Sequence, residues 1–340
     1  MKDMLESTPD STPDSTPGRS CPLRYRYGAS AIAHAPQVET ETLYVVGGLY
    51  GNVEALEVIE RMAAAESGHV RVCFNGDFNW FNVDDEGFEQ IMSRVLQHDA
   101  VLGNVEAELG IDGAEAGCGC AYPESVSAEV VERSNRIHAR LKATASRHAS
   151  LTARLTALPM FARYLVGHCR VGVVHGDAES LAGWRFSRDE LDNPASSAWI
   201  NQVFEEAAVD VFASSHTCEP VLKHVQRHNA ALHSNHTKQL DLTPLSEKLS
   251  IVINNGAAGM PNDTAALCGR ITRISRVPFQ PQAVSAAAVI ERSFFGETEV
   301  AALSVPYDHE KWRARFLANW PEGSDAYQSY YARITGESVR

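Results

Sequence analysis

Short apolar runs recur along this chain, and each one ends in a cluster of glycine and polar residues. The runs occupy residues 43–46, 70–74, 100–102, 171–174, 209–213 and 249–253. Runs this short, rich in Val, Ile and Phe and bounded by glycine, are typical of buried β-strands. Helical patterns lie between several of them, at 53–65, 88–96, 128–141 and 198–208. Strands that alternate with helices predict an α/β domain with a mostly parallel sheet.

The polar clusters all begin at the carboxyl end of an apolar run. In open α/β sheets, the loops at these ends build the ligand site. Six clusters from distant parts of the sequence are therefore expected to converge on one edge of the sheet. Such a composite site constrains the function more than any single motif does.

Four side chains in these clusters are candidate metal ligands: Asp77, Asn104, His175 and His216. Together they offer one carboxylate, one amide oxygen and two imidazoles. Mixed oxygen and imidazole donors suit a divalent transition metal such as Mn, Fe or Zn better than Mg or Ca. The sequence therefore predicts one bound divalent metal.

The composition limits the classes of function. Hydrophobic residues make up 44% of the 340 residues, which is enough for a packed core. The formal charge is −13, and an acidic surface repels phosphates, so no nucleic acid is expected as a partner. No stretch approaches the roughly 18 apolar residues of a membrane-spanning helix, so no membrane association is expected. Seven cysteines without a secretory signal predict a cytoplasmic location.

The chain divides into three predicted parts. Residues 1–22 repeat Ser-Thr-Pro-Asp without aromatic residues, and we expect them to form a disordered arm. Residues 40–305 are expected to form the main domain, with an insertion at 107–159. Residues 306–340 are expected to form a helical appendage. Its apolar stripe predicts a helix docked on the core, through Trp312, Phe316 and Trp320.

Five short segments, in order, resemble the motifs of the calcineurin-like metallophosphoesterase superfamily. They read GLYGN, NGDFN, GNVE, VHGD and SHTC, and they are followed by INNGAAGMPND. The resemblance runs from about residue 43 to about residue 304. It implies an α/β fold of two packed mixed β-sheets flanked by helices, which is a four-layer αββα sandwich.

The resemblance also implies the roles of the candidate ligands. In this family a Gly-Asp aspartate bridges two metals, and Asp77 stands at that position. The other ligands of one metal correspond to Asn104, His175 and His216, so that half of the site is intact. The resemblance implies metal-dependent hydrolysis of a small phosphorylated substrate, with Asp77 and the retained Glu106 as catalytic residues. Glu106 is expected to help orient the attacking water.

The other half of the implied site is substituted. The positions of its ligands are Gly48, Tyr50 and Cys218, and Val105 replaces the family's site histidine. A second ion is therefore not expected to bind in the usual way. Two alternatives to hydrolysis follow: a non-catalytic sensor of metal or phosphoanion, or altered Fe or Zn chemistry assisted by Tyr50 and Cys218. These two residues either fill the vacated space, or ligate the metal as phenolate and thiolate, or are covalently linked.

Three further residues each have two possible roles. Cys118 and Cys120, in Gly-Cys-Gly-Cys, form either a tight loop with incidental thiols or a loop that folds over the cleft and supplies a thiolate or a redox pair. Asp177, close to His175, either orients that histidine or caps the helix that follows.

Two rival classes fit less well. GGLYGN follows a predicted strand like a dinucleotide-binding fingerprint, but that pattern needs glycine at the position of Val46. A serine-hydrolase elbow of the form G-x-S-x-G is absent from the sequence.

Overall fold

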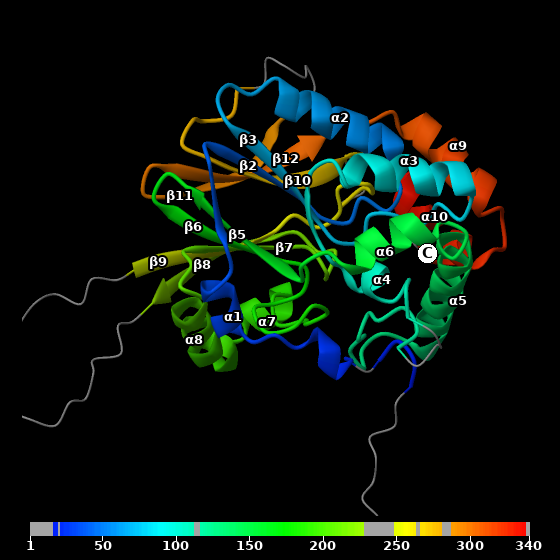
Figure 1. Cartoon of the computed structure of the whole chain (residues 1–340), viewed down its shortest axis with the longest axis horizontal. Coiled ribbons are helices and arrows are strands. Elements are labelled where there is room, and N and C mark those ends of the chain that lie inside the picture. Colours follow the sequence, from blue (N-terminus) through cyan, green and yellow to red (C-terminus); the bar gives the residue numbers. More distant parts are fainter. Residues whose placement is uncertain are drawn as a thin grey trace, which may run out of the picture.

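The computed structural model describes residues 16–19, 21–111, 116–227, 248–262, 266–280 and 287–337 (Figure 1). Its strands form two six-stranded mixed sheets. The first 15 residues of the predicted arm lie outside the described residues. Residues 16–19 are described, and the Arg19 guanidinium donates to the carbonyl oxygens of Pro123 at 2.8 Å and Val126 at 2.6 Å.

The first sheet has the order β11-β12-β10-β2-β3-β4. Strands β2, β3 and β4 are parallel, whereas β10, β12 and β11 join by antiparallel pairing. In chain order the strands are β2 (Thr42–Val46), β3 (Val70–Asn75), β4 (Asp99–Val101), β10 (Gly269–Ser275), β11 (Val289–Phe295) and β12 (Thr298–Val305). The parallel part therefore holds the first three predicted runs.

The second sheet has the order β1-β5-β6-β7-β9-β8. Strands β6, β7 and β9 are mutually parallel neighbours, and they hold the other three predicted runs. In chain order the strands are β1 (Gln37–Thr40), β5 (Phe161–Val166), β6 (Cys169–Val174), β7 (Val211–Ser214), β8 (Val221–Arg227) and β9 (Lys248–Asn254). The expectation of one mostly parallel sheet was wrong, because antiparallel strands extend both parallel centres.

The two sheets pack face to face. One buried cluster joins Leu43 and Val45 of β2 to Val171 of β6 and Ile251 of β9. The alternate residues Tyr44 and Val46 of β2 point the other way, into a cluster with the helices. Both faces of β2 are thus buried, which explains why its sequence is continuously apolar rather than alternating.

Helices cover the outer faces of both sheets, so the predicted four-layer arrangement is confirmed. The first sheet carries α2 (Val53–Ala64) and α3 (Asp85–Val95), and the second carries α1 (Ala29–Ala33), α7 (Arg188–Asp192) and α8 (Ser197–Ala207) (Figure 1). Short 3₁₀ turns occupy Leu23–Tyr25 and Pro194–Ser196. No helix among the described residues is long and apolar enough to cross a membrane.

A group of helices lies at one end of the sandwich. The predicted insertion supplies α5 (Ala128–Ala145) and α6 (Ala149–Thr156), which follow the short α4 (Asn104–Ala107). The C-terminal residues form α9 (His309–Asn319) and α10 (Asp325–Thr335). Their docking is tight: the predicted stripe Trp312, Phe316 and Trp320 is buried, and Arg136 of α5 pairs with Asp325 of α10 at 2.7 Å.

Candidate functional site

The predicted polar clusters converge at one edge of the two sheets. Asp77 follows β3, Asn104 begins α4 after β4, and His175 and His216 follow β6 and β7. All four side chains are buried. The strands bring them together from positions as far apart as 139 residues because their carboxyl ends meet at the same edge.

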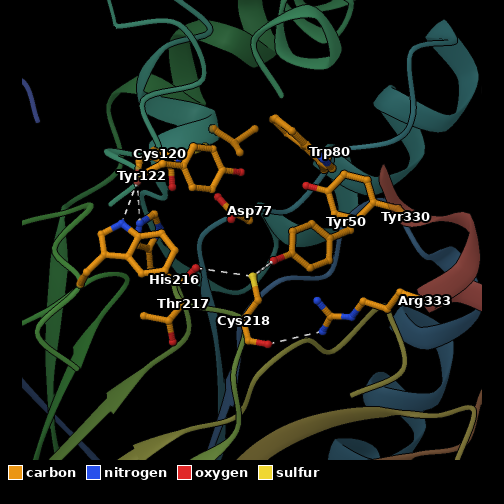
Figure 2. Close-up of a pocket in the computed structure, with 13 residues that line it drawn as sticks. Tyr50, Asp77, Trp80, Cys120, Tyr122, His216, Thr217, Cys218, Tyr330 and Arg333 are labelled. Carbon is orange, nitrogen blue, oxygen red and sulfur yellow. Dashed lines mark hydrogen bonds between the residues drawn. The ribbon is translucent and has the colours of Figure 1, made fainter. Parts of the chain in front are cut away.

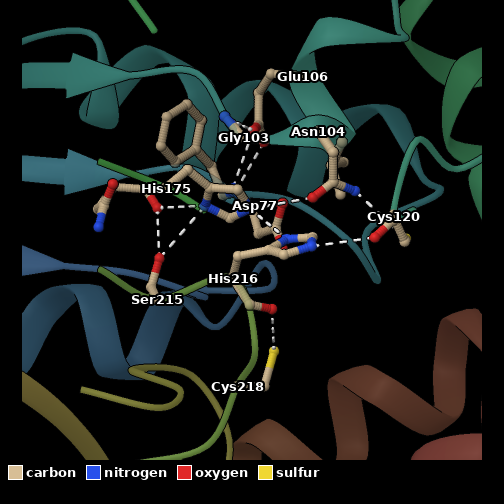
Figure 3. Close-up of polar contacts among 12 residues, drawn as sticks. Asp77, Gly103, Asn104, Glu106, Cys120, His175, Ser215, His216 and Cys218 are labelled. Atoms are coloured by element: carbon tan, nitrogen blue, oxygen red, sulfur yellow. Dashed lines mark hydrogen bonds and ion pairs between the residues drawn. The ribbon is translucent and has the colours of Figure 1, made fainter. Parts of the chain in front are cut away.

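The four side chains meet around the Nε2 atom of His175 (Figure 3). This atom lies 3.0 Å from Asn104 Oδ1, 3.1 Å from His216 Nδ1 and 3.4 Å from Asp77 Oδ1. Ligands about 2.1 Å from one ion lie about 3.0 Å apart in octahedral geometry and about 3.4 Å apart in tetrahedral geometry. The three distances to His175 Nε2 fall within this range.

The remaining polar atoms of these side chains fix which atoms carry hydrogen. His175 Nδ1 lies 2.9 Å from the carbonyl oxygen of Asn75, and His216 Nε2 lies 3.1 Å from that of Cys120. A carbonyl oxygen only accepts, so each of these nitrogens is the N–H donor and the other ring nitrogen bears a lone pair. Burial lowers the pKa of both imidazoles, so both rings are neutral near pH 7.

The oxygen ligands face the same point with their acceptor atoms. The amide nitrogen of Asn104 donates to the carbonyl oxygen of Cys118 at 2.9 Å, which turns Oδ1 toward His175. Asp77 Oδ1 is buried without a hydrogen-bond partner among the described residues. These acceptors lie close together, and a cation, a proton on Asp77 or a water molecule would relieve that arrangement.

The candidate ligand set includes the side-chain amide of Asn104. Within the described part of the chain, no group of three or more His, Cys, Asp or Glu side chains is arranged to hold a metal. Asp77 lies against His175, and His175 lies against both Asn104 and His216. Asp77, His175 and His216 alone therefore do not form such a group, and a cation site here rests on the contacts that these residues and Asn104 make at His175 Nε2.

Asp77 sits in a strained and crowded turn. Its φ angle is 55°, a left-handed conformation that non-glycine residues rarely adopt. A Cβ on Gly103 would lie 2.6 Å from the backbone nitrogen of Asp77, so only glycine allows this approach. Burial raises the pKa of Asp77 to about 7. A cation against this carboxylate would stabilise its charged form.

Glu106 holds the Asp77 turn from behind. Its carboxyl oxygens accept the backbone N–H groups of Asp77 at 2.9 Å, Phe78 at 2.8 Å and Gly103 at 3.1 Å (Figure 3). The side chain is fully buried and does not line the adjoining pocket. Burial and the charge of Asp77 raise its pKa to about 7. These contacts position Asp77 and leave no face of Glu106 toward the pocket.

The substituted half is physically filled. The Tyr50 hydroxyl lies 2.5 Å from Cys218 Sγ, and a Cβ on Gly48 would lie 2.7 Å from the Tyr50 ring. Tyr50 and Cys218 both have left-handed backbone angles, of 54° and 55°. Burial raises the pKa of both groups, so they stay protonated near pH 7. The two polar atoms are in hydrogen-bond contact, and Cys218 forms no disulfide.

The Cys118–Cys120 loop contacts the site through its carbonyl oxygens, and the Cys120 sulfur also accepts a hydrogen bond from Asn104 Nδ2 at 3.3 Å. Its glycines, Gly117 and Gly119, have φ angles of 57° and 69°, which turn the carbonyls of Cys118 and Cys120 onto Asn104 and His216. Both thiols are free and buried, and burial raises the pKa of Cys120. The loop does lie over the cleft, but the two ligands it orients are held by backbone atoms.

Asp177 does not orient His175. It accepts the backbone N–H groups of Glu179 at 2.9 Å, Ser180 at 3.1 Å and Arg185 at 3.2 Å, and so closes the loop after β6. His175 instead donates to Asn75, with Ser215 Oγ 3.3 Å from the same nitrogen. The first of the two expectations for Asp177 was therefore wrong.

A pocket of about 170 Å³ opens beside these residues (Figure 2). Its polar floor includes Asp77, Asn104 and His216. Aromatic rings make up much of its wall, from Tyr50, Trp80, Tyr122, Trp184 and Tyr330. The sequence reasoning missed Trp80, Trp184 and the two lining residues of α10, Tyr330 and Arg333. Only the aromatic content of the C-terminal segment hinted at this contribution.

Comparisons with known proteins show structural similarity only. No protein-family model matches the chain, and no curated protein matches its sequence. A metallophosphoesterase from Sphaerobacter thermophilus is 18% identical, with a TM-score of 0.49, over 87% of this chain and 99% of that one. A hypothetical protein from Pyrococcus horikoshii is 14% identical, with a TM-score of 0.48, over 84% and 96%.

A protein serine/threonine phosphatase from Saccharomyces cerevisiae is 12% identical, with a TM-score of 0.37, over 83% of this chain and 88% of that one. The α/β sandwich is defined by the strand pairing of this chain itself. The site is likewise assigned from this chain's own contacts.

Proposed function

We propose that this protein is a metal-dependent phosphoesterase that works with one divalent ion, held by Asp77, Asn104, His175 and His216. The observation that carries this proposal is that acceptor atoms of Asp77, Asn104 and His216 lie 3.0 to 3.4 Å from His175 Nε2, which is itself an acceptor. Two neutral imidazoles and two oxygens suit Mn, Fe or Zn. An ion bound there would polarise a phosphoryl oxygen and lower the pKa of its bound water.

The surrounding residues then act by holding the ligands in place. The carbonyl oxygens of Cys118 and Cys120 orient Asn104 and His216, and that of Asn75 orients His175. Glu106 holds the backbone at Asp77 and is assigned here as a positioning residue rather than the group that orients water. Such supporting hydrogen bonds typically change metal affinity or activity by about 10–100-fold.

Among the described lining residues, no group outside the proposed ligands is suited to protonate a leaving group near pH 7. Val105 lines the pocket next to Asn104 and carries no proton to give. Apart from the proposed ligands, the ionisable acids of the lining are phenols and thiols, and burial raises the pKa of Tyr50, Cys120, Tyr122, Cys218 and Tyr330. Water would add to phosphorus while the ester oxygen leaves as an anion. The favoured substrates are thus small phosphoesters with a stable leaving anion.

The test is turnover of p-nitrophenyl phosphate with added Mn²⁺. We expect hydrolysis by the full chain, and loss of at least about 100-fold in kcat/KM for Asp77→Asn. Asp192→Asn, at a site on α7 that pairs with Lys223 on the surface, is the matched control and should retain activity. Equal rates for Asp77→Asn and the unaltered protein would contradict the proposal.

A second candidate function is supported by the filled half of the site. A protein that keeps one ion and has Tyr50 and Cys218 in the place of a second can bind a phosphoanion without hydrolysing its ester. Tight metal retention together with no turnover of aryl phosphates or phosphodiesters would favour this sensor over the esterase.

A further inference from the structure

Arg333 of α10 places a positive charge in the pocket wall. Its Nε donates to the carbonyl oxygen of Pro261 at 2.9 Å and one terminal nitrogen donates to that of Cys218 at 3.4 Å. Among the described residues, no carboxylate lies within ion-pair distance of its guanidinium. Because guanidinium has five N–H donors, Arg333 keeps several for an anion in the pocket (Figure 2).

The helix holds Arg333 in a fixed position. Asp325, in the first turn of α10, pairs with Arg136, and Ser329 accepts from Arg133 at 2.8 Å. The Tyr330 ring, one turn before Arg333, packs edge-on against Phe81 with centroids 5.1 Å apart. A cation fixed in this way loses little side-chain entropy when it binds an anion.

The aromatic wall offers flat surfaces on opposite sides of the pocket. Figure 2 shows Tyr122 across the pocket from Trp80 and Tyr330. Trp80 is buried, and its indole N–H has no hydrogen-bond partner among the described residues. An unpartnered buried donor is costly unless a ligand or water meets it.

We propose that α10 completes a binding site for phosphoesters of an aromatic group. Arg333 contacts the phosphoryl oxygens, and the aromatic group lies between Tyr122 on one side and Trp80 and Tyr330 on the other. This inference rests on the proposed function. It makes Arg333 and Tyr330 substrate-binding residues from the C-terminal appendage.

Two phosphonates test the inference without turnover, because their C–P bond is not an ester. We expect phenylphosphonate to bind the protein as purified about tenfold more tightly than methylphosphonate, as measured by calorimetry. Arg333→Gln should weaken both ligands by about tenfold or more, and Arg333→Lys should recover part of the loss. Arg313→Gln is the control, since Arg313 pairs with Glu310 on the exposed side of α9.

The aromatic part has its own variant. Tyr330→Leu should weaken phenylphosphonate by severalfold and leave methylphosphonate unchanged, so that the preference shrinks. Tyr327→Leu is the matched control, because Tyr327 stacks on Tyr331 and does not line the pocket. Circular dichroism of each variant separates loss of binding from loss of folding.

The results distinguish this inference from the proposed function. Aryl preference and Arg333 dependence without hydrolysis of p-nitrophenyl phosphate would uphold the binding site and end the esterase proposal. Hydrolysis with equal affinity for the two phosphonates, or binding unaffected by Arg333→Gln, would uphold the esterase and overturn the inference.

Discussion

The two halves of the site lie at the same sheet edge and differ in whether their polar atoms have partners. On one side, four acceptor atoms of Asp77, Asn104, His175 and His216 lie close together. On the other side, the Tyr50 ring fills the space beside Gly48 and its hydroxyl meets the Cys218 thiol. One half has unsatisfied lone pairs, whereas the other is satisfied without a ligand.

The difference shows what keeps a site ready for a cation. Backbone carbonyls orient Asn104, His175 and His216 in the open half, and Glu106 fixes the strained turn at Asp77. In the filled half, protonated side chains partner each other, since burial raises the pKa of Tyr50 and Cys218. The ability of a site to accept a cation therefore depends on neighbouring carbonyl and carboxyl groups that hold its ligands in place.

The largest effect should follow loss of an imidazole from the open half. His175→Ala removes the atom at which the other three ligands meet, so we expect metal affinity to fall by at least about 100-fold. Elemental analysis after gel filtration measures the loss. His34→Ala, on the exposed end of α1, should keep its metal, and unchanged metal in His175→Ala would refute the ligand assignment.

Removing the support behind Asp77 should cost stability next. Glu106→Gln places an amide N–H₂ against a backbone N–H group, so we expect about 2–3 kcal/mol less unfolding free energy in urea, together with weaker metal binding. Glu132→Gln, on the exposed side of α5, should change neither. A Glu106→Gln protein with unaltered stability would show that the buried carboxyl does not hold the turn.

The filled half should resist any new side chain at residue 48. Gly48→Ala adds a left-handed backbone penalty and a clash with the Tyr50 ring, together about 2 kcal/mol. Gly296→Ala is the matched control, because Gly296 has a φ of 57° with open space around it. The difference between the two losses, read from thermal unfolding, isolates the clash. Equal losses would mean that the Tyr50 ring does not occupy this space.

The smallest effect should come from the Tyr50 hydroxyl. Tyr50→Phe removes one hydrogen bond to Cys218 and keeps the ring, so we expect about 1 kcal/mol less stability and the same metal content. Loss of metal from this variant would identify Tyr50 as a ligand and undo the contrast between the halves.

Much of the open half could be predicted from the sequence. Parallel pairing brings together the carboxyl ends of β3 and β4 in one sheet and of β6 and β7 in the other, and the packing of the two sheets joins the pairs. The short polar clusters after those strands contain Asp77, Asn104, His175 and His216, and their side-chain types point to a metal site. Their convergence follows from the topology, and the structure bears it out.

The supporting contacts could not be predicted in the same way. Every residue has a carbonyl, so nothing in the sequence distinguishes the carbonyls of Cys118 and Cys120, which are turned by loop angles. The sequence pattern instead suggested a role for the thiols of Cys118 and Cys120. Likewise, Arg333 reaches the pocket only because α10 docks on α5, and that depends on tertiary packing far along the chain.

Metal content of the purified full-length protein tests the contrast between the halves most directly. Elemental analysis should find one Mn, Fe or Zn ion per chain, bound through the half where acceptors meet. Two ions per chain would show that the half occupied by Tyr50 and Cys218 still binds metal, and none after exposure to these metals would show that the four acceptors do not form a site.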